Sequence, residues 1–189
     1  MNLVFYYIGS YLIGNILTGY LLAKIFYRTD IQKHGSGNPG ARNAGRLYGK
    51  KAFLFTFFGD ALKGSFVILI GRVFHFSETE ILIGLGLAVI GHIKPILLNF
   101  KGGKGISTFI GGILTFAPIT AAIIIVGFLL TYPFTKSFTL SGLFSLCLIP
   151  FSIAYITNKI NNLWVLAVLL LVLILAHSEN VFKKINGRK

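Results

Sequence analysis

Residues 107–134, STFIGGILTFAPITAAIIIVGFLLTYPF, form an apolar run that decides how many times this chain can cross a membrane. As one helix the run would extend about 42 Å at about 1.5 Å per residue, against a hydrocarbon core of about 30 Å. Ala117-Pro118 offers a break, because proline disfavours helical geometry at the residue before it. We therefore predict two helices here, a short one over residues 107–117 and a longer one after Pro118.

The rest of the chain is equally apolar. Of its 189 residues, 54% are hydrophobic and 12% are charged, whereas soluble domains carry about 25% charged residues. We therefore predict an all-α polytopic membrane protein, a single domain over residues 1–189 with seven transmembrane helices, the first of them retained rather than cleaved as a signal peptide. Besides the two central helices, the predicted spans are residues 3–23, 53–74, 80–100, 137–157 and 163–176.

Basic side chains predict the orientation of these helices. With seven spans and an outside N-terminus, the outer segments carry Arg72 and Lys159, and the other Lys and Arg residues between the spans fall on the inner side. Cytoplasmic segments are enriched in Lys and Arg, so we expect an outside N-terminus and a cytoplasmic C-terminus. Because the net charge of +13 lies between apolar spans, no nucleic-acid partner is predicted. The single cysteine, Cys147, excludes an intrachain disulfide.

The longest polar interval contains residues 35–46, GSGNPGARNAGR. Glycines allow the backbone to turn several N–H groups toward one point, and such a nest binds anions. Arg46 or Arg42 can add the planar guanidinium group that fits phosphate. The alternative is an ordinary turn between two helices, which has a similar composition.

A second glycine-rich loop, residues 101–105, KGGKG, comes directly before a predicted helix. The N-terminus of a helix favours an anion, so Lys104 is predicted to bind phosphate. The alternative is a lysine at the membrane surface. The loop is not a Walker A motif, because it lacks both the spacing and the βαβ unit of that motif.

Several polar residues lie inside the predicted spans. Buried ionisable groups normally face each other or a polar cavity, and the three-residue spacing of Asp60 and Lys63 lets them pair on one helix. They form either a purely structural pair or part of an active cavity, and His92 falls in the inner third of the next span.

The inner end of the last predicted helix carries two further polar groups. His177 and Asn180 share one helical face, where they can hydrogen-bond a substrate hydroxyl or phosphate. Ordinary interfacial polarity is the alternative. Thr139, at the inner end of the preceding span, is a weaker candidate for the same rim.

Together, these blocks resemble the bacterial acyl-phosphate:glycerol-3-phosphate acyltransferase family. The family's motifs are GSGN-x-GATN followed by arginine, D-x-x-K-G, GH-x-x-P…F-x-GGKG and H-R-x-N-I…G. This chain departs from them at Arg42, which replaces a threonine, and at Ser178, which replaces an arginine. The matching positions, in chain order, are residues 35–46, 60–64 and 91–105, followed by His177, Asn180 and Gly187.

The resemblance implies an enzyme of the bacterial plasma membrane with its active site facing the cytoplasm. It implies transfer of a fatty acyl group from acyl phosphate to the 1-hydroxyl of glycerol 3-phosphate, giving lysophosphatidic acid and phosphate, the first step of phospholipid synthesis. No cofactor and no metal are expected. The implied partners are the two substrates, membrane lipid, and, transiently, the enzyme that produces acyl phosphate.

The resemblance also assigns roles by motif position. The implied catalytic residues are Ser36, Arg46, Lys104 and His177. The implied substrate-binding residues are Gly35, Gly37, Asn38, Asn43, Gly102, Gly103, Gly105, Thr139 and Asn180. The residues expected to line the cavity are Asp60, Lys63 and His92.

The sequence also limits the mechanism. None of the inner histidines is followed by the aspartate of an H-x-x-x-x-D pair, and no nucleophile elbow is present. Direct attack by the substrate hydroxyl is therefore expected, with the donor's phosphate or His177 accepting the proton.

Two rival functions predict different features. A phosphate or organophosphate transporter would also use buried charges and anion-binding half-helices, but it usually has an internal repeat, and we find none. A lipid-pyrophosphate phosphatase would need clustered carboxylates to hold a metal ion, and the acidic residues near the inner side are few and scattered.

Overall fold

The computed structural model describes residues 1–157 and 160–178, and within them it contains helices and no strand. The chain divides into two compact units, residues Met1–Phe116 and Ala117–Lys189, called here the N-terminal and C-terminal units. The predicted break at Ala117-Pro118 is confirmed, since one helix ends at Phe116 and the next begins at Thr120. The expectation of a single domain over residues 1–189 stays a prediction.

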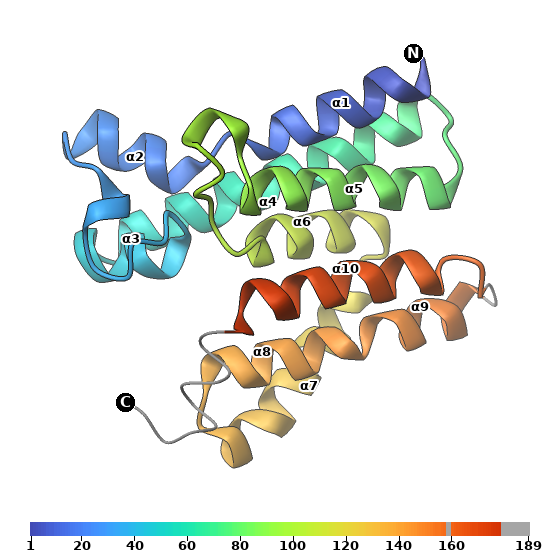
Figure 1. Ribbon diagram of the computed structural model, residues 1–189. Coiled ribbons are helices and arrows are strands. Elements are labelled where there is room, and N and C mark those ends of the chain that lie inside the picture. The colour runs from blue at the N-terminus through green and yellow to red at the C-terminus, as the bar shows by residue number, and fades with distance from the viewer. Residues whose placement is uncertain (158–159, 179–189) are drawn as a thin grey trace. The chain divides into compact units, whose positions relative to one another are not determined.

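The N-terminal unit is a bundle in which α5 packs between α1 and α6, with α4 behind them (Figure 1). Two short 3₁₀ helices, η1 and η2, lie in the loops at one end of this bundle. The bounds of these elements are α1 Leu3–Gly14, α2 Thr18–Phe26, η1 Ile31–Lys33, α3 Ala41–Tyr48, α4 Lys50–Val73, α5 Glu78–Ile93, η2 Ile96–Leu98 and α6 Ile106–Phe116.

The first predicted span is broken, so the expectation of one helix over residues 3–23 was wrong. Its two pieces, α1 and α2, are bent by 44° relative to each other. The side chain of Asn15 donates to the Tyr11 carbonyl at 2.7 Å, directly after the last residue of α1. The backbone N–H of Asn15 donates to the same carbonyl at 3.1 Å, so this carbonyl accepts both groups of Asn15. Asparagine side chains that bond to nearby backbone favour helix ends over helix interiors.

The third predicted span also ends early. α5 stops at Ile93 rather than continuing to residue 100, because Pro95 has no N–H and cannot extend a helix. The short helix η2 follows, and residues 78–98 together are long and apolar enough to cross a membrane, as is α4.

Small residues allow α4 and α6 to cross closely. A Cβ atom on Gly64 would overlap the Thr108 carbonyl oxygen, and one on Gly111 would overlap the Ala61 carbonyl oxygen. Membrane helices associate largely through such close packing. Gly9 of α1 differs, since a Cβ atom added there would have no described atom within 4 Å.

Within its described residues, the C-terminal unit contains four helices, and several of its hydroxyl groups bond to the backbone of their own helix. Thr131 Oγ1 donates to the Gly127 carbonyl at 2.7 Å, and Ser145 Oγ donates to the Gly142 carbonyl at 2.8 Å. The predicted helix over residues 137–157 is interrupted at Leu148, just before Pro150. The bounds are α7 Thr120–Thr135, α8 Phe138–Cys147, α9 Ile149–Thr157 and α10 Leu163–Ala176.

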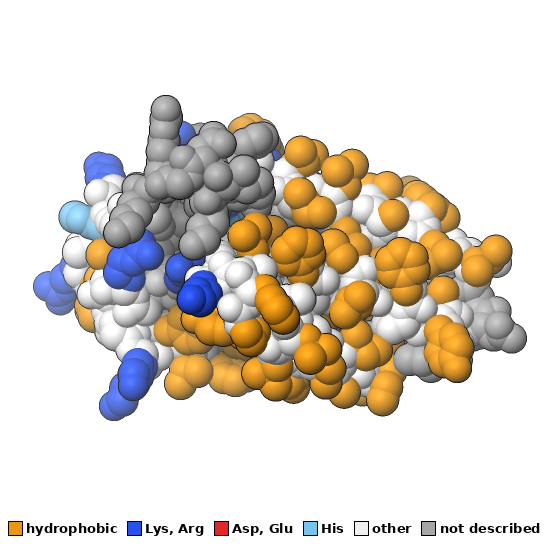
Figure 2. Space-filling view, turned by 90° about the horizontal axis from the view of Figure 1, so that it is seen from below, with side chains coloured by type: hydrophobic (Ala, Val, Ile, Leu, Met, Phe, Trp, Pro, Cys, Tyr) orange, Lys and Arg blue, Asp and Glu red, His pale blue; other side chains and the backbone are white. Residues whose placement is uncertain are grey.

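Apolar side chains cover much of the described surface, as Figure 2 shows for one face. Three described helical segments are long and apolar enough to cross a membrane, or four if α1 and α2 count as one bent span. The shorter apolar helices are α6, α7 and α10. A soluble protein does not expose apolar surface of this extent, so the chain is membrane-embedded.

Candidate functional site

The two glycine-rich loops of the N-terminal unit meet at the same end of its bundle. Gln32 Nε2, in η1 just before the first loop, donates to the Lys101 carbonyl of the second loop at 2.5 Å. At the opposite end, the Tyr6 ring near the N-terminus packs on Phe76, with centroids 4.9 Å apart. The loops that follow the first and third predicted spans therefore lie together, away from the N-terminus.

The first loop is held in shape by Asn43. Its side-chain Oδ1 accepts the Ser36 N–H at 3.0 Å, and its Nδ2 donates to the His34 carbonyl at 3.0 Å. Gly35 and Gly37 have φ angles of +62° and +71°, which residues with a Cβ rarely adopt. The amide of Asn43 is thus used to fold the loop, while the Ser36 side chain is exposed at its surface.

The remaining predicted residues of this loop lie at or on α3. Asn38 Oδ1 accepts the Gly40 N–H at 3.0 Å, just before the helix begins at Ala41. Arg46 is exposed in the last turn of α3, and Arg42 is exposed in its first turn. The loop therefore presents a hydroxyl and two guanidinium groups on exposed positions.

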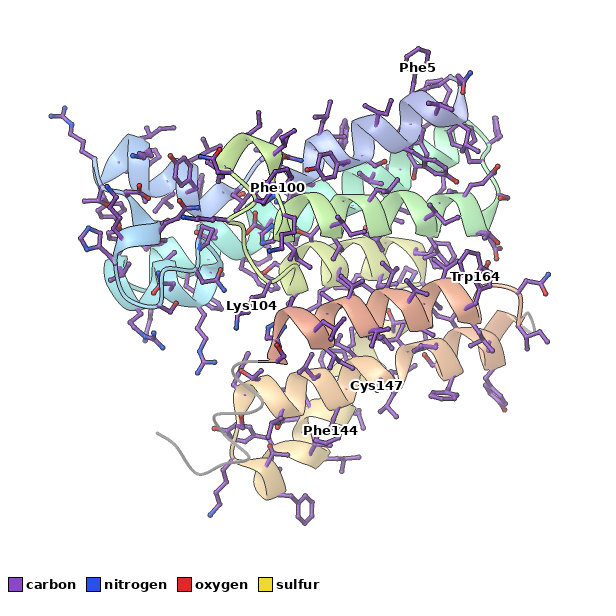
Figure 3. The ribbon with its side chains drawn as sticks, in the orientation of Figure 1. Phe5, Phe100, Lys104, Phe144, Cys147 and Trp164 are labelled. Atoms are coloured by element: carbon purple, nitrogen blue, oxygen red, sulfur yellow. The ribbon has the colours of Figure 1, made fainter. Side chains whose placement is uncertain are left out.

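The second loop folds back onto the end of α5. The Gly102 N–H donates to the Ile93 carbonyl at 3.2 Å, and the Gly103 N–H donates to the His92 carbonyl at 2.9 Å. These N–H groups anchor the loop to the end of α5. That Gly102, Gly103 and Gly105 bind substrate stays a prediction. Lys104 follows, directly before Gly105 and the first turn of α6 (Figure 3).

Asp60, Lys63 and His92 form a buried cluster, with exposed fractions of 1%, 7% and 2%. The predicted pairing is confirmed, since Lys63 Nζ lies 3.1 Å from Asp60 Oδ1. Lys63 Nζ also lies 2.8 Å from His92 Nδ1. That the three residues line an active cavity stays a prediction.

The cluster also satisfies the backbone where the first span breaks. Lys63 Nζ donates to the carbonyls of Gly14 and Ile16, at 3.1 and 2.7 Å. Asp60 Oδ1 accepts the Thr18 N–H, at the start of α2, at 3.2 Å. In lipid, an irregular backbone needs such partners because water is not there to supply them.

The described part of the C-terminal unit carries two of the predicted residues, His177 and Thr139. His177 caps α10, and its Nδ1 bonds to the Leu173 carbonyl at 2.8 Å. Since a carbonyl only accepts, Nδ1 carries the proton and Nε2 holds the lone pair of the neutral ring. Thr139 lies in the first turn of α8. Asn180 lies outside the described residues.

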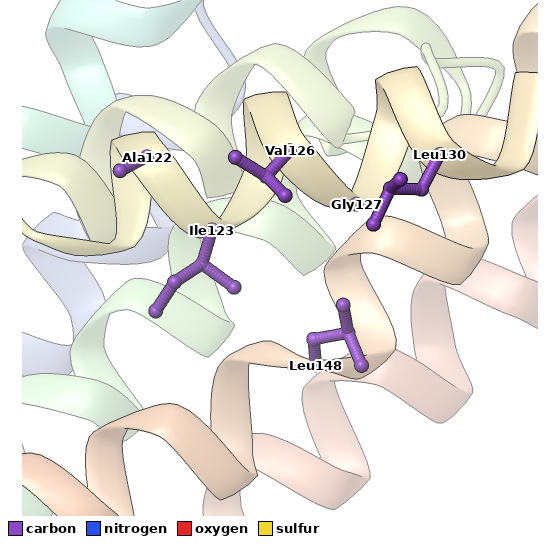
Figure 4. Close-up of a pocket in the computed structure, with 6 residues that line it drawn as sticks. All are labelled: Ala122, Ile123, Val126, Gly127, Leu130 and Leu148. Carbon is purple, nitrogen blue, oxygen red and sulfur yellow. The ribbon is translucent and has the colours of Figure 1, made fainter.

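A pocket of the C-terminal unit is entirely apolar. It has a volume of about 270 Å³ between α7 and the junction of α8 with α9 (Figure 4). Its walls can contact an alkyl chain, but they offer no charged or hydrogen-bonding side chain to a phosphate. The lining residues are Ala122, Ile123, Val126, Gly127, Leu130 and Leu148.

Three contacts at this end of the bundle were not predicted from the sequence. Gln32 bridges the loops, Tyr11 OH donates to the Lys94 carbonyl at 2.8 Å, and Asn43 folds the first loop rather than facing outward. Only the position of Gln32 beside the glycine-rich segment was a usable signal. The contact between Tyr11 and Lys94 joins residues far apart in the chain, so no local sequence pattern predicts it.

Known proteins similar to this chain share one description. A family model described as glycerol-3-phosphate acyltransferase matches residues 4–187. Glycerol-3-phosphate acyltransferase 1 of a Bacillus cereus strain is 43% identical over 169 residues, which cover 87% of this chain and 93% of the relative. The protein of the same name from Desulfitobacterium hafniense is 39% identical over 183 residues, covering 97% of this chain and 91% of the relative.

The fold is also similar to that of a solved membrane protein. The crystal structure of PlsY, described as an integral membrane glycerol 3-phosphate acyltransferase in its glycerol 3-phosphate form, matches with a TM-score of 0.88 and 29% identity. The match covers 99% of this chain and 94% of that one. A second PlsY structure, in a lysophosphatidic acid form, matches with the same TM-score.

Proposed function

This chain belongs to the glycerol-3-phosphate acyltransferase family, and we propose that it uses acyl phosphate as its acyl donor. The reaction transfers the fatty acyl group to the 1-hydroxyl of glycerol 3-phosphate and gives lysophosphatidic acid and inorganic phosphate. The observation that carries the proposal is the meeting of two glycine-rich loops, joined by Gln32 and Lys101, at one end of a membrane-embedded bundle. Both proposed substrates carry phosphate, so two adjoining loops with basic residues suit them.

The proposed phosphate ligands are the exposed Ser36 and Arg46 and the partly buried Lys104. Ser36 and Arg46 lie on the first loop and on α3, and Lys104 lies directly before the first turn of α6. Charged donors hold phosphate through short, strong hydrogen bonds, and the N-terminus of α6 adds a favourable dipole. Because the N–H groups of Gly102 and Gly103 are bonded to α5, we assign phosphate binding to Lys104 and the helix rather than to those glycines.

The proposed chemistry is a single displacement. The 1-hydroxyl oxygen of glycerol 3-phosphate attacks the acyl carbonyl carbon, a new C–O ester bond forms, and the bond from that carbon to the phosphate oxygen breaks. The departing phosphate takes the bonding electrons. Ser36, Arg46 and Lys104 stabilise the charge that develops on the phosphate and the carbonyl oxygen.

The hydroxyl proton passes either to the departing phosphate or to His177. The bond from His177 Nδ1 to Leu173 leaves the lone pair of the neutral ring on Nε2, which suits a general base. A His177→Gln variant that keeps substantial turnover would eliminate the histidine as base and leave the phosphate as proton acceptor. Asn180, three positions after His177 in the sequence, is also proposed to bind glycerol 3-phosphate, and Thr139 is the weaker candidate.

We also infer seven spans, with the N-terminus outside and the loops in the cytoplasm. The observed break before Thr120 supports two helices in the central run. The first and second loops lie at the same end of the bundle, opposite Tyr6 and Phe76. This arrangement supports three spans that cross the membrane in alternating directions. The basic residues of both loops favour the cytoplasmic side.

The donor is tested with purified protein and labelled glycerol 3-phosphate. Palmitoyl phosphate, palmitoyl-CoA and acyl-carrier protein are offered separately, with metal ions chelated. The proposal predicts lysophosphatidic acid from palmitoyl phosphate alone. Product from a thioester would overturn the assignment of the donor, and absence of product from every donor, together with flux of glycerol 3-phosphate into sealed vesicles, would indicate a transporter.

A further inference from the structure

The buried ion pair of Asp60 and Lys63 is connected to the second loop by His92, which contacts both Lys63 and Gly103. Lys63 Nζ lies 2.8 Å from His92 Nδ1, and an ammonium group only donates, so Nδ1 accepts and the ring proton lies on Nε2. Nε2 faces Gly103, because a Cβ atom on that glycine would overlap it. The His92 carbonyl also accepts the Gly103 N–H at 2.9 Å. Ring and backbone of His92 therefore both support the loop just before Lys104.

The same ion pair is connected to the first loop by the start of α2, which contacts both Asp60 and Pro39. Asp60 Oδ1 accepts the Thr18 N–H at 3.2 Å and so fixes the start of that helix. Gly19 is the next residue, and a Cβ atom on it would overlap the carbonyl oxygen of Pro39 in the first loop. The start of α2 is therefore in backbone contact with the first loop, and one cluster supports both loops.

We propose that Asp60, Lys63 and His92 are positioning residues that set the separation of the two phosphate-binding loops. The inference rests on the proposed function for the role of the loops, but not on the identity of the acyl donor. Lys63 is suited to this task because its ammonium meets four acceptors, two of them carbonyls of the broken span. Where water is excluded, such bonds hold their geometry without competition.

The test measures binding of labelled glycerol 3-phosphate by equilibrium dialysis, without an acyl donor. His92→Phe keeps a ring beside Gly103 and removes the acceptor for Lys63, whereas His92→Asn keeps an acceptor near the Nδ1 position and removes the ring. The double variant Asp60→Asn/Lys63→Met removes both charges at once, so that no unpaired charge stays buried. Ser65→Ala is the matched control, because Ser65 links α4 to Gly111 of α6 at 2.9 Å.

Each cluster variant is expected to raise the Kd for glycerol 3-phosphate about tenfold, and Ser65→Ala to leave it unchanged. His92→Phe removes the contact with Lys63, which the double variant has already removed, so adding it to the double variant is expected to raise the Kd no further. A purely structural cluster would lower the folded fraction and leave the Kd of the folded protein unchanged. That result, or fold-changes that multiply in the triple variant, would overturn the proposal.

Binding by the wild-type protein separates this inference from the proposed function. Wild-type protein that binds no glycerol 3-phosphate overturns the proposed function, and the inference with it. Wild-type and folded variants that bind equally well overturn the inference alone. Should His92→Phe fail to fold, His92→Asn and the double variant decide the question by the same Kd.

Discussion

The N-terminal and C-terminal units use polar side chains in different ways. In the N-terminal unit, Lys63 bonds to Gly14 and Gln32 to Lys101, so polar groups join segments far apart in the chain. In the C-terminal unit, Thr131 bonds within its own helix, to a carbonyl one turn earlier. Long-range polar contacts of the N-terminal unit also join regular helices, as from Ser65 to Gly111, but those of Lys63 and Gln32 lie at the broken span and the two loops. These contacts hold in place the segments to which we assign phosphate binding.

The largest expected effect is that of Lys63→Met on stability. The change leaves the Asp60 carboxylate buried without its ion-pair partner, which typically costs about 3 to 5 kcal/mol. Thermal unfolding in lipid nanodiscs would measure it. The double variant Asp60→Asn/Lys63→Met should recover most of the loss. Equal destabilisation by the single and the double variant would show that the buried charge is not the cause.

The next effect is that of Lys104→Ala on acyl transfer. Removing one charged donor from developing charge should lower kcat/KM about 10² to 10³-fold, with little change in stability because Lys104 precedes α6 in a loop. Steady-state assays with glycerol 3-phosphate would measure it. Lys101→Ala, in the same loop, is the control and should keep most of the activity. Similar losses in both variants would indicate a general effect of loop charge.

A smaller effect, about tenfold, is expected for Gly103→Ala. The new Cβ would overlap Nε2 of His92, so the loop must shift away from its support, and the KM for glycerol 3-phosphate should rise. Gly9→Ala is the control, since its Cβ would meet no described atom within 4 Å. An unchanged KM in Gly103→Ala would show that the loop tolerates displacement.

The smallest expected effects are the losses of unfolding free energy when a single hydroxyl group is removed from each unit. Ser65→Ala removes a bond between α4 and α6 in the N-terminal unit, and such interhelical bonds are worth about 0.6 kcal/mol in membrane proteins. Ser145→Ala removes a bond to Gly142 of the same helix and should cost less. Unfolding measurements on both variants give the comparison directly. A larger loss in Ser145→Ala would contradict the greater role of long-range polar contacts in the N-terminal unit.

The sequence predicted those features that have a local cause. Pro118 marked the break between α6 and α7, and the three-residue spacing of Asp60 and Lys63 marked their ion pair. The break between α1 and α2 was missed, because that segment contains no proline. Its cause combines Asn15, which bonds to the preceding turn, with Asp60 and Lys63 on another helix. Because Asp60 and Lys63 are distant in sequence, the residues between α1 and α2 carry no periodic pattern that would predict the break.

The candidate site shows the same limit. Glycine, serine and lysine in the two loops indicated anion binding from composition alone. Composition could not show that Asn43 folds the first loop, or that Gly103 donates its N–H to the end of α5. The hydrogen bonds of Asn43 and Gly103 depend on which backbone groups lie next to them, and the packing of the helices determines those neighbours.

The most direct test of the account is a structure of the protein with bound glycerol 3-phosphate. We expect phosphate oxygens about 3 Å from Lys104 Nζ and in contact with the first loop near Ser36, with the contacts from Asp60 to His92 unbroken. Glycerol 3-phosphate bound away from both loops, with Lys104 and Ser36 out of reach of the phosphate, would contradict it.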